Sequence, residues 1–338
     1  MSAGRPLRVA VLGSSGGWHA ERIRGALTER GHSTVPARVT ALVGRIDGGV
    51  AIGAAAPQRR GGEATGAGAG AARSTTGAAP PVGAAGAIDL GACDAVLVRG
   101  LPRGSLEQTI LRVDALHVLA AGGVVVVNGA AAIERTVDKL LATALLARAG
   151  LPTPRTVACE RREDAVAAFE ELGGDVILKP LFGSMGHGMA RLSDPELARR
   201  AFDVLELERA VYYLQEAIEH GGRDVRALVV GGRVVAAIER VGEGWRLNRA
   251  AGARARPLEL DAERERLCVE AAAALGAEYA GVDLLRDPDG RDLVVEANGI
   301  PGWQGLERAT GVDVAAALVE HLEELVAGGR RSTDGADG

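Results

Sequence analysis

The chain has 338 residues, of which 47% are hydrophobic and 25% are charged, and its formal net charge is −5. This length allows two or three modest domains with a sizeable core. The slightly acidic balance argues against nucleic-acid binding, and the apolar runs are too short to cross a bilayer. No signal-peptide pattern precedes the first predicted strand, so we expect a cytoplasmic protein with no membrane partner.

The first 130 residues alternate between strand and helix patterns, which predicts a small α/β domain over residues 1–130. Its predicted elements are the strand Leu7–Leu12, the helix Trp18–Arg30, a strand within Val39–Ile52, the strand Cys93–Arg99, the helix Leu106–Ala121 and the strand Val124–Asn128.

The glycine-rich turn 13–17 follows the first strand of this domain. It lacks the G-x-G-x-x-G spacing of a dinucleotide-binding fingerprint, so a tight strand-to-helix turn is the better interpretation. Arg99 and Asn128 end their strands, where ligands bind in such sheets. For Arg99, a substrate contact and a surface charge are equally good interpretations. Residues 53–87 consist mainly of Gly, Ala, Pro, Ser and Thr, which predicts a flexible low-complexity insertion in a surface loop.

A second domain is predicted over residues 131–327, with a flexible polar tail over 328–338. One hairpin stands out, because Val225–Val230 and Arg233–Arg240 are joined by two glycines. The predicted helices are Ile133–Arg148, Arg162–Leu172, Asp194–Leu207, Glu263–Leu275 and Val312–Val326, and the other strands are Thr156–Ala158, Val176–Lys179, Val211–Ala217 and a pair around Asp283 and Glu296.

Two carboxylates and an amide lie on the last predicted strand pair. Glu296 and Asn298 are two residues apart and therefore share one face of their strand. If residues 288–291 form a four-residue loop, Asp283 lies directly opposite Glu296. Oxygen ligands of this kind suit Mg²⁺. The alternative is that they are ordinary polar residues on a solvated face, but the apolar runs before Asp283 and Glu296 favour the metal.

Lys179 ends an apolar strand and is followed by the glycine-rich loop 183–188, a combination that suits phosphate groups. Only two of the 39 basic residues are lysines, Lys139 and Lys179. A chain that otherwise uses arginine is expected to keep lysine where a compact ammonium group is needed. His187 is most simply a residue of the loop.

Further candidates lie between these two stretches. The strand end from Gln215 to Ile218 could bind an adenine edge through its backbone, with the Glu216 carboxylate on a ribose hydroxyl. A row of arginines could bind carboxylate or phosphate oxygens. These are Arg226, Arg240, Arg246 and Arg249.

In combination, these motifs resemble the ATP-grasp superfamily and, within it, the RimK-like α-L-glutamate ligases. The resemblance covers roughly residues 133–326, and the N-terminal domain is similar to the Rossmann-like pre-ATP-grasp domain. It implies an ATP-grasp fold whose two subdomains clasp ATP and join near residues 211–218. The stretches 179–183, 242–245 and 301–306 are most similar to the branch that adds glutamate to tetrahydromethanopterin, a folate-like one-carbon carrier.

Carried over residue by residue, the resemblance implies roles for three groups. The catalytic candidates are Arg226, Arg240 and Arg249. The ATP-binding candidates are Lys139, Lys179, Gly183, Ser184, Met185, Gly186, Gly188, Gln215, Glu216, Ala217, Ile218, Asp224, Arg246 and Asn248. The metal ligands are Asp283, Glu296 and Asn298, which would hold Mg²⁺ or Mn²⁺, as two ions bridged by Glu296.

The implied reaction is ATP-dependent. A carboxylate attacks the γ-phosphoryl group, ADP leaves, and the amine of L-glutamate attacks the acyl phosphate. The implied partners are L-glutamate and a small-molecule carboxylate acceptor, and similar proteins form homo-oligomers. After Asn248 and at Gly299 the sequence departs from the family pattern, which bears on the acceptor. Two alternatives are a RimK-like ligase acting on a protein C-terminus, a carrier protein or another amino acid, and a non-catalytic ATP-binding regulatory module.

Overall fold

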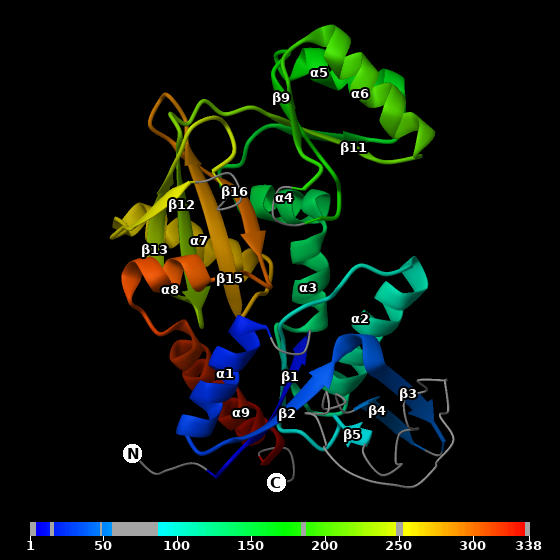
Figure 1. Cartoon of the computed structure of the whole chain (residues 1–338), viewed down its shortest axis with the longest axis vertical. Helices are drawn as coiled ribbons and strands as arrows, with labels where there is room; N and C mark the ends of the chain where they lie inside the picture. The colour runs from blue at the N-terminus through cyan, green and yellow to red at the C-terminus, as the bar shows by residue number, and fades with distance from the viewer. Residues whose placement is uncertain are drawn as a thin grey trace, which may run out of the picture. The chain divides into compact units, whose positions relative to one another are not determined.

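The computed structural model describes residues 5–13, 17–47, 49–55, 87–183, 187–247 and 253–334 (Figure 1). The chain divides into two compact units. The first contains residues 1–130 together with 318–338, and the second contains residues 131–317. The end of the last helix, α9 (Val314–Asp334), therefore belongs to the N-terminal unit. This helix continues eight residues past its expected end at Val326, through residues 327–334.

The N-terminal unit contains a parallel sheet in the order β2-β1-β6-β7. Its strands are β1 (Arg8–Gly13), β2 (Ser33–Arg38), β6 (Ala95–Val98) and β7 (Val125–Val127), and its helices include α1 (Trp18–Glu29) and α2 (Leu106–Ala121). This confirms the predicted α/β alternation. The sequence patterns missed β2, because it is an edge strand that contains a proline and lacks a buried apolar run.

A small antiparallel sheet completes the N-terminal unit. It is formed by β3 (Leu42–Ile46), β4 (Val50–Ala55) and β5 (Ala87–Asp89), after the short 3₁₀ helix η1 (Val39–Ala41). The single strand predicted within Val39–Ile52 is thus two strands of a hairpin. The first and last residues of the predicted insertion belong to β4 and β5, and its remainder, residues 56–86, lies outside the described residues.

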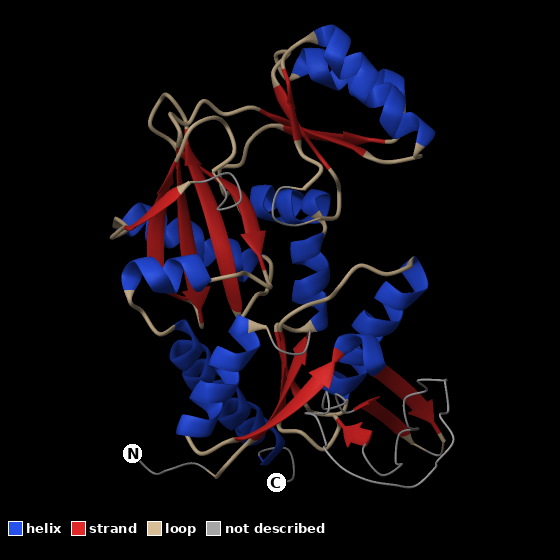
Figure 2. Ribbon diagram, in the orientation of Figure 1, coloured by secondary structure: helices blue, strands red, loops and turns tan. Residues whose placement is uncertain are grey.

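The second unit contains two sheets (Figure 2). The smaller one has the order β10-β9-β11-β8 and is made of β8 (Thr156–Cys159), β9 (Val176–Lys179), β10 (Ala190–Leu192) and β11 (Tyr212–Glu216). Helices α5 (Arg162–Glu171) and α6 (Pro195–Leu207) pack on it. Phe169 and Phe202 from these helices meet Tyr212 and Leu214 of β11 in a common core. Burial of this face leaves the other face of the small sheet for polar groups.

The larger sheet has five antiparallel strands in the order β14-β13-β12-β15-β16. They are β12 (Arg223–Val230), β13 (Arg233–Val241), β14 (Arg254–Pro257), β15 (Tyr279–Arg286) and β16 (Asp292–Asn298). The predicted hairpin is confirmed, since Val230 pairs with Arg233 and both turn glycines have positive φ angles, 56° and 71°. Helix α7 (Ala262–Ala274) and part of α4 (Lys139–Arg148) share the core of one sheet face.

The structure contains two helices where the sequence predicts one. The predicted helix Ile133–Arg148 is divided into α3 (Ala130–Val137) and α4, because Asp138 adopts an extended conformation and caps α4. Its side chain accepts a hydrogen bond from the Leu141 N–H at 3.0 Å. The break places Lys139 at the first position of α4. A further short helix, α8 (Gln304–Thr310), was not predicted. Of the helices in the described ranges, none combines the length and apolarity needed to cross a membrane.

Candidate active site

One face of the five-stranded sheet carries the charged residues that the sequence singled out. Val225 and Ala227 of β12 and Val282 of β15 lie in the core on the opposite face. Because side chains alternate along a strand, Arg226 and Asp283 point away from that core. The two residues are also direct partners across β12 and β15. Burial of the apolar face thus produces a polar stripe across neighbouring strands.

Asp283 lies directly opposite Glu296, as predicted, but the connecting loop differs from the prediction. Arg286 pairs with Asp292, so the loop has five residues, 287–291, rather than four. A five-residue loop alone would put the two carboxylates out of register. A β-bulge in β16, between Val294 and Glu296, shifts the register back by one residue. The expected pair is therefore formed, although the predicted loop was wrong.

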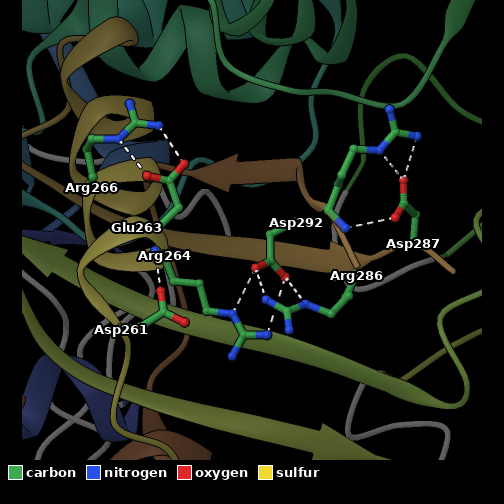
Figure 3. Close-up of polar contacts among 8 residues, drawn as sticks. Asp261, Glu263, Arg264, Arg266, Arg286, Asp287 and Asp292 are labelled. Atoms are coloured by element: carbon green, nitrogen blue, oxygen red, sulfur yellow. Dashed lines mark hydrogen bonds and ion pairs between the residues drawn. The ribbon is translucent and has the colours of Figure 1, made fainter. Parts of the chain in front are cut away.

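The far end of this hairpin is fixed by ion pairs (Figure 3). Asp292 lies between Arg264 of α7 and Arg286 of β15, at 2.9 Å and 2.6 Å. Asp287 closes the loop by accepting a hydrogen bond from the Arg291 N–H at 2.8 Å. Burial opposes ionisation of Asp292, but the hydrogen bonds from Arg286 and Arg264 outweigh it and lower the pKa. These contacts anchor the loop and so support the register on which the site depends.

Two predicted catalytic arginines contact the predicted metal ligand Asp283. Arg226 donates from Nη1 to both carboxylate oxygens, at 3.0 and 2.8 Å, and Arg240 Nη2 lies 3.1 Å from Oδ1. Arg240 also forms a two-bond pair with Asp224, at 2.6 and 2.8 Å. Burial raises the pKa of Asp224 to about 6 in spite of these two bonds. Asp224, which was expected near the nucleotide, thus orients an arginine of the same network.

Gly281 is a site residue whose role the sequence did not reveal. A Cβ atom at this position would lie 2.7 Å from Nη2 and 2.9 Å from Nε of Arg226. The missing side chain therefore leaves the space in which the Arg226 guanidinium group lies. The glycine is visible in the sequence, but its partner is set by the pairing of β12 with β15.

Both lysines lie close to the carboxylates. Burial lowers the pKa of Lys179 to about 8, while the negative charge of Glu296 acts in the opposite direction. Burial also lowers the pKa of Lys139, again opposed first by Glu296. Lys139 Nζ donates to the carbonyl oxygen of Gly183 at 3.0 Å. Glu296 is thus an electrostatic neighbour of both lysines, although each lysine lies more than a hundred residues before it in the sequence.

The strand end expected to bind adenine is partly occupied by protein contacts. The Gln215 side chain is buried and accepts a hydrogen bond from Lys179 Nζ at 2.5 Å. The Glu216 carboxylate accepts one from the Arg155 N–H at 2.8 Å. The Glu216 and Ala217 N–H groups bond to the carbonyls of Arg155 and Asp175, respectively. These N–H groups are therefore engaged within the protein.

The remaining candidates fall into two groups. Gly183 and Gly188 flank the centre of the loop, and both have positive φ angles, 156° and 76°. The Arg246 guanidinium group stacks on the Trp245 ring, 4.6 Å from its centroid. The candidates that lie outside the described residues are Ser184, Met185, Gly186, Asn248 and Arg249.

The donor set can be tested for its fit to Mg²⁺. Asp283 and Glu296 supply facing carboxylates, and Asn298 lies on the same strand as Glu296. The Asn298 amide oxygen already accepts a hydrogen bond from the Ile300 N–H at 2.9 Å. Across the described ranges, no three His, Cys, Asp or Glu side chains form a metal cluster by themselves. Hard oxygen donors in this number suit Mg²⁺ that completes its shell with phosphate and water.

The RimK-like ATP-grasp domain matches residues 136–322. The chain belongs to the RimK-like ATP-grasp family. Within this family it is 34% identical over 271 residues to the tetrahydromethanopterin:α-L-glutamate ligase of Methanosarcina acetivorans, which covers 72% of this chain and 83% of that protein. It is 32% identical over 209 residues to the α-aminoadipate–LysW ligase LysX of Saccharolobus solfataricus. This match covers 60% of this chain and 76% of that protein.

The fold agrees with this assignment. The structure of the ATP-grasp ligase PsnB complexed with minimal precursor, Mg and ADP matches with a TM-score of 0.67, over 94% of this chain and 98% of that one, at 21% identity. This confirms the predicted ATP-grasp fold. As a RimK-like ATP-grasp protein, the chain is a ligase of the class that forms carbon–nitrogen bonds and releases ADP.

Proposed function

We propose that this ligase adds L-glutamate to a small-molecule carboxylate of the tetrahydromethanopterin type, through an acyl-phosphate intermediate. The observation that carries the proposal is the single cluster in which the only two lysines of the chain face Glu296, beside Asp283 and its two arginines. It combines cations for ATP phosphates, oxygen donors for Mg²⁺ and guanidinium groups for a carboxylate. We retain residues 131–327 as the proposed ligase domain.

The chain's own residues would act as follows. Lys139 and Lys179 bind the α- and β-phosphates of ATP, and the loop 183–188 covers the γ-phosphate. Arg226 and Arg240 steady the acceptor carboxylate while its oxygen attacks the γ-phosphorus and ADP leaves. The glutamate nitrogen then attacks the acyl carbon, phosphate leaves, and the amine gives up a proton. Mg²⁺ or Mn²⁺, when held by Asp283, Glu296 and Asn298 as one or two ions, offsets the phosphate charge.

A second acceptor class has a specific observation in its favour. One relative at 32% identity is named as a ligase that joins α-aminoadipate to LysW, which is not a tetrahydromethanopterin reaction. A carrier protein or peptide is therefore the alternative acceptor for this chain. Both acceptors use the same ATP chemistry, so only product analysis separates them.

The test is ADP release from Mg-ATP and glutamate, with and without a tetrahydromethanopterin-type acceptor, followed by mass spectrometry. We expect acceptor-dependent ADP and a mass gain of one glutamyl unit. The Glu296→Gln variant should lose ADP release, whereas Glu324→Gln, on α9 outside the site, should retain it. ADP release without that mass gain would transfer the proposal to carrier-protein acceptors. ATP binding with no ADP release under any acceptor would instead indicate a regulatory module.

A further inference from the structure

A chain of hydrogen bonds lies beneath Lys179 on the polar face of the small sheet. Lys179 of β9 pairs with Tyr213 of β11, and Gln215 is two residues further along β11 on the same face. Lys179 Nζ donates to Gln215 Oε1 at 2.5 Å. Gln215 Nε2 donates to Thr156 Oγ1 of β8 at 3.0 Å. The chain ends where the Thr156 hydroxyl donates to the Pro154 carbonyl at 3.0 Å.

The Pro154 carbonyl determines which atoms donate and which accept along this series of hydrogen bonds. The Pro154 carbonyl can only accept a hydrogen bond, so the Thr156 hydroxyl uses its single proton there. That hydroxyl oxygen is then an acceptor for the Gln215 amide N–H₂ group. With its nitrogen held by Thr156, Gln215 turns its oxygen toward Lys179. The ammonium group donates only, so an oxygen at this position is the complementary partner.

We propose that Gln215 is a positioning residue for Lys179, whose side-chain oxygen holds the ammonium group where an ATP phosphate can reach it. This inference rests on the proposed role of Lys179 in binding ATP. It gives the Gln215 side chain a role of its own, beside the expected binding of adenine by the backbone of residues 215–218. Gln215 is only 2% exposed and Lys179 only 7%, so water contributes little to holding either group.

Burial explains why a positioning residue is needed. Burial lowers the pKa of Lys179 to about 8, with the charge of Lys139 acting in the same direction and the charges of Glu296 and Asp283 opposing it. Loss of the Lys179 charge thus comes close to physiological pH. A buried ammonium group without an acceptor would lose its proton more readily still. The Gln215 oxygen stabilises the charged form without itself carrying a charge that would repel ATP phosphates.

The lysine content of the chain permits a direct test. With only two lysines, Lys139 and Lys179, protein labelled with [ε-¹³C]lysine gives two side-chain NMR signals, which the Lys139→Arg variant assigns. The full-length protein would be titrated from pH 6 to pH 11 without nucleotide. The measured quantity is the midpoint of the Lys179 signal, so the experiment does not depend on ATP binding.

Two near-isosteric variants should move this midpoint in opposite directions. Gln215→Glu places a carboxylate on the ammonium group and should raise the midpoint by at least one pH unit. Gln215→Met removes the acceptor and should lower it by about one unit, as should Thr156→Val, which frees the amide to rotate. Thr109→Val on α2 is the matched control, because the Thr109 hydroxyl donates to the Ser105 carbonyl at 3.0 Å, away from this hydrogen-bond chain, and it should leave the midpoint unchanged.

ATP titrations on the same variants separate this inference from the proposed function. The pH at which ATP affinity begins to fall should follow the Lys179 midpoint. At pH 9, the Gln215→Met variant should therefore bind ATP about tenfold more weakly than the wild type. An unmoved midpoint in Gln215→Glu, Gln215→Met and Thr156→Val would overturn the positioning role. A moved midpoint in a protein that binds no ATP would overturn the proposed function instead.

Discussion

The guanidinium group of Arg226 lies in the space that a side chain at position 281 would fill. A Cβ atom there would approach Nη2 to 2.7 Å and Pro301 Cβ to 2.9 Å. The arginine is held by two bonds to Asp283, and Pro301 leaves an added Cβ atom at position 281 no free space on its own side. The absence of a side chain at Gly281 on β15 is therefore required for Arg226 to lie beside Asp283.

We predict that Gly281→Ala displaces Arg226 from Asp283. Because Arg226 steadies the reacting carboxylate, its displacement should lower kcat by about 10–100-fold. Overpacking by the added methyl group should also cost about 1–3 kcal/mol of stability. Steady-state kinetics and urea denaturation measure the two effects. Gly305→Ala is the control, because a Cβ atom there meets nothing within 4 Å. Unchanged kcat in Gly281→Ala would contradict the role given to Arg226.

ATP affinity should depend on pH through Lys179. Its pKa is lowered to about 8, so the free protein loses this positive charge as pH rises through that value. We expect Kd for ATP to be flat below pH 8 and to rise up to tenfold per pH unit above it, since each unit of pKa difference corresponds to 1.36 kcal/mol. Isothermal titration calorimetry from pH 6 to pH 9.5 measures this. A Kd that stays flat to pH 9.5 would show that Lys179 does not bind a phosphate.

The same shift affects folding stability. Because the folded-state pKa of Lys179 lies below the ordinary lysine value of 10.5, the unfolded chain binds more protons between pH 8 and pH 10.5. The penalty for burying the charged lysine is fully present below pH 8 and is relieved as pH rises through that window. Lys179→Met should therefore gain stability over the wild type at pH 7 and lose most of that advantage above pH 10, by urea denaturation.

Asp292 should contribute strongly to stability. Its side chain is 7% exposed and bonds to the largely buried Arg264 and the half-exposed Arg286, so Asp292→Asn leaves the Arg264 charge with a weaker partner. We expect a loss of about 2–4 kcal/mol at pH 7. The lowered pKa means that this contribution is present above the unfolded value near 4 and is lost as pH falls through the lower folded value.

Denaturation of the two proteins at pH 7 and pH 3 tests this expectation. Asp289→Asn, in the adjoining loop 287–291, is the matched control, because the Asp289 side chain is 79% exposed and its replacement should change stability by less than about 0.5 kcal/mol. Equal stability of Asp292→Asn and wild type at pH 7 would mean that the ion pairs do not hold the loop.

The cap at Asp138 should connect helix stability with nucleotide binding. Asp138→Ala removes the hydrogen bond to the Leu141 N–H and should cost about 1 kcal/mol. Because Lys139 is the next residue, ATP affinity should also fall, by about threefold to tenfold. Asp194→Ala removes a similar cap from α6, where Asp194 accepts from Glu196 and Leu197. It should cost similar stability without changing ATP affinity, and equal loss of affinity in both variants would contradict the link.

Local sequence patterns predict the candidate site residues and most of the strands in the described part of the chain. Alternating apolar runs predict β12, β13 and β15, because one face of each strand must be buried. The scarcity of lysine marks Lys139 and Lys179, and the same alternation places Glu296 and Asn298 on one face. These inferences depend only on local periodicity and composition.

Which of these groups meet depends on long-range contacts in the folded protein. The facing of Asp283 and Glu296 depends on a β-bulge that compensates for a longer loop, and a bulge leaves no periodic signal in the sequence. Asp138 divides a pattern that reads as one helix, because its side chain caps α4 more favourably than it continues α3. Gln215 faces Lys179 because the antiparallel pairing of β9, β11 and β8 puts Lys179, Gln215 and Thr156 on one face, a long-range arrangement that no local pattern specifies.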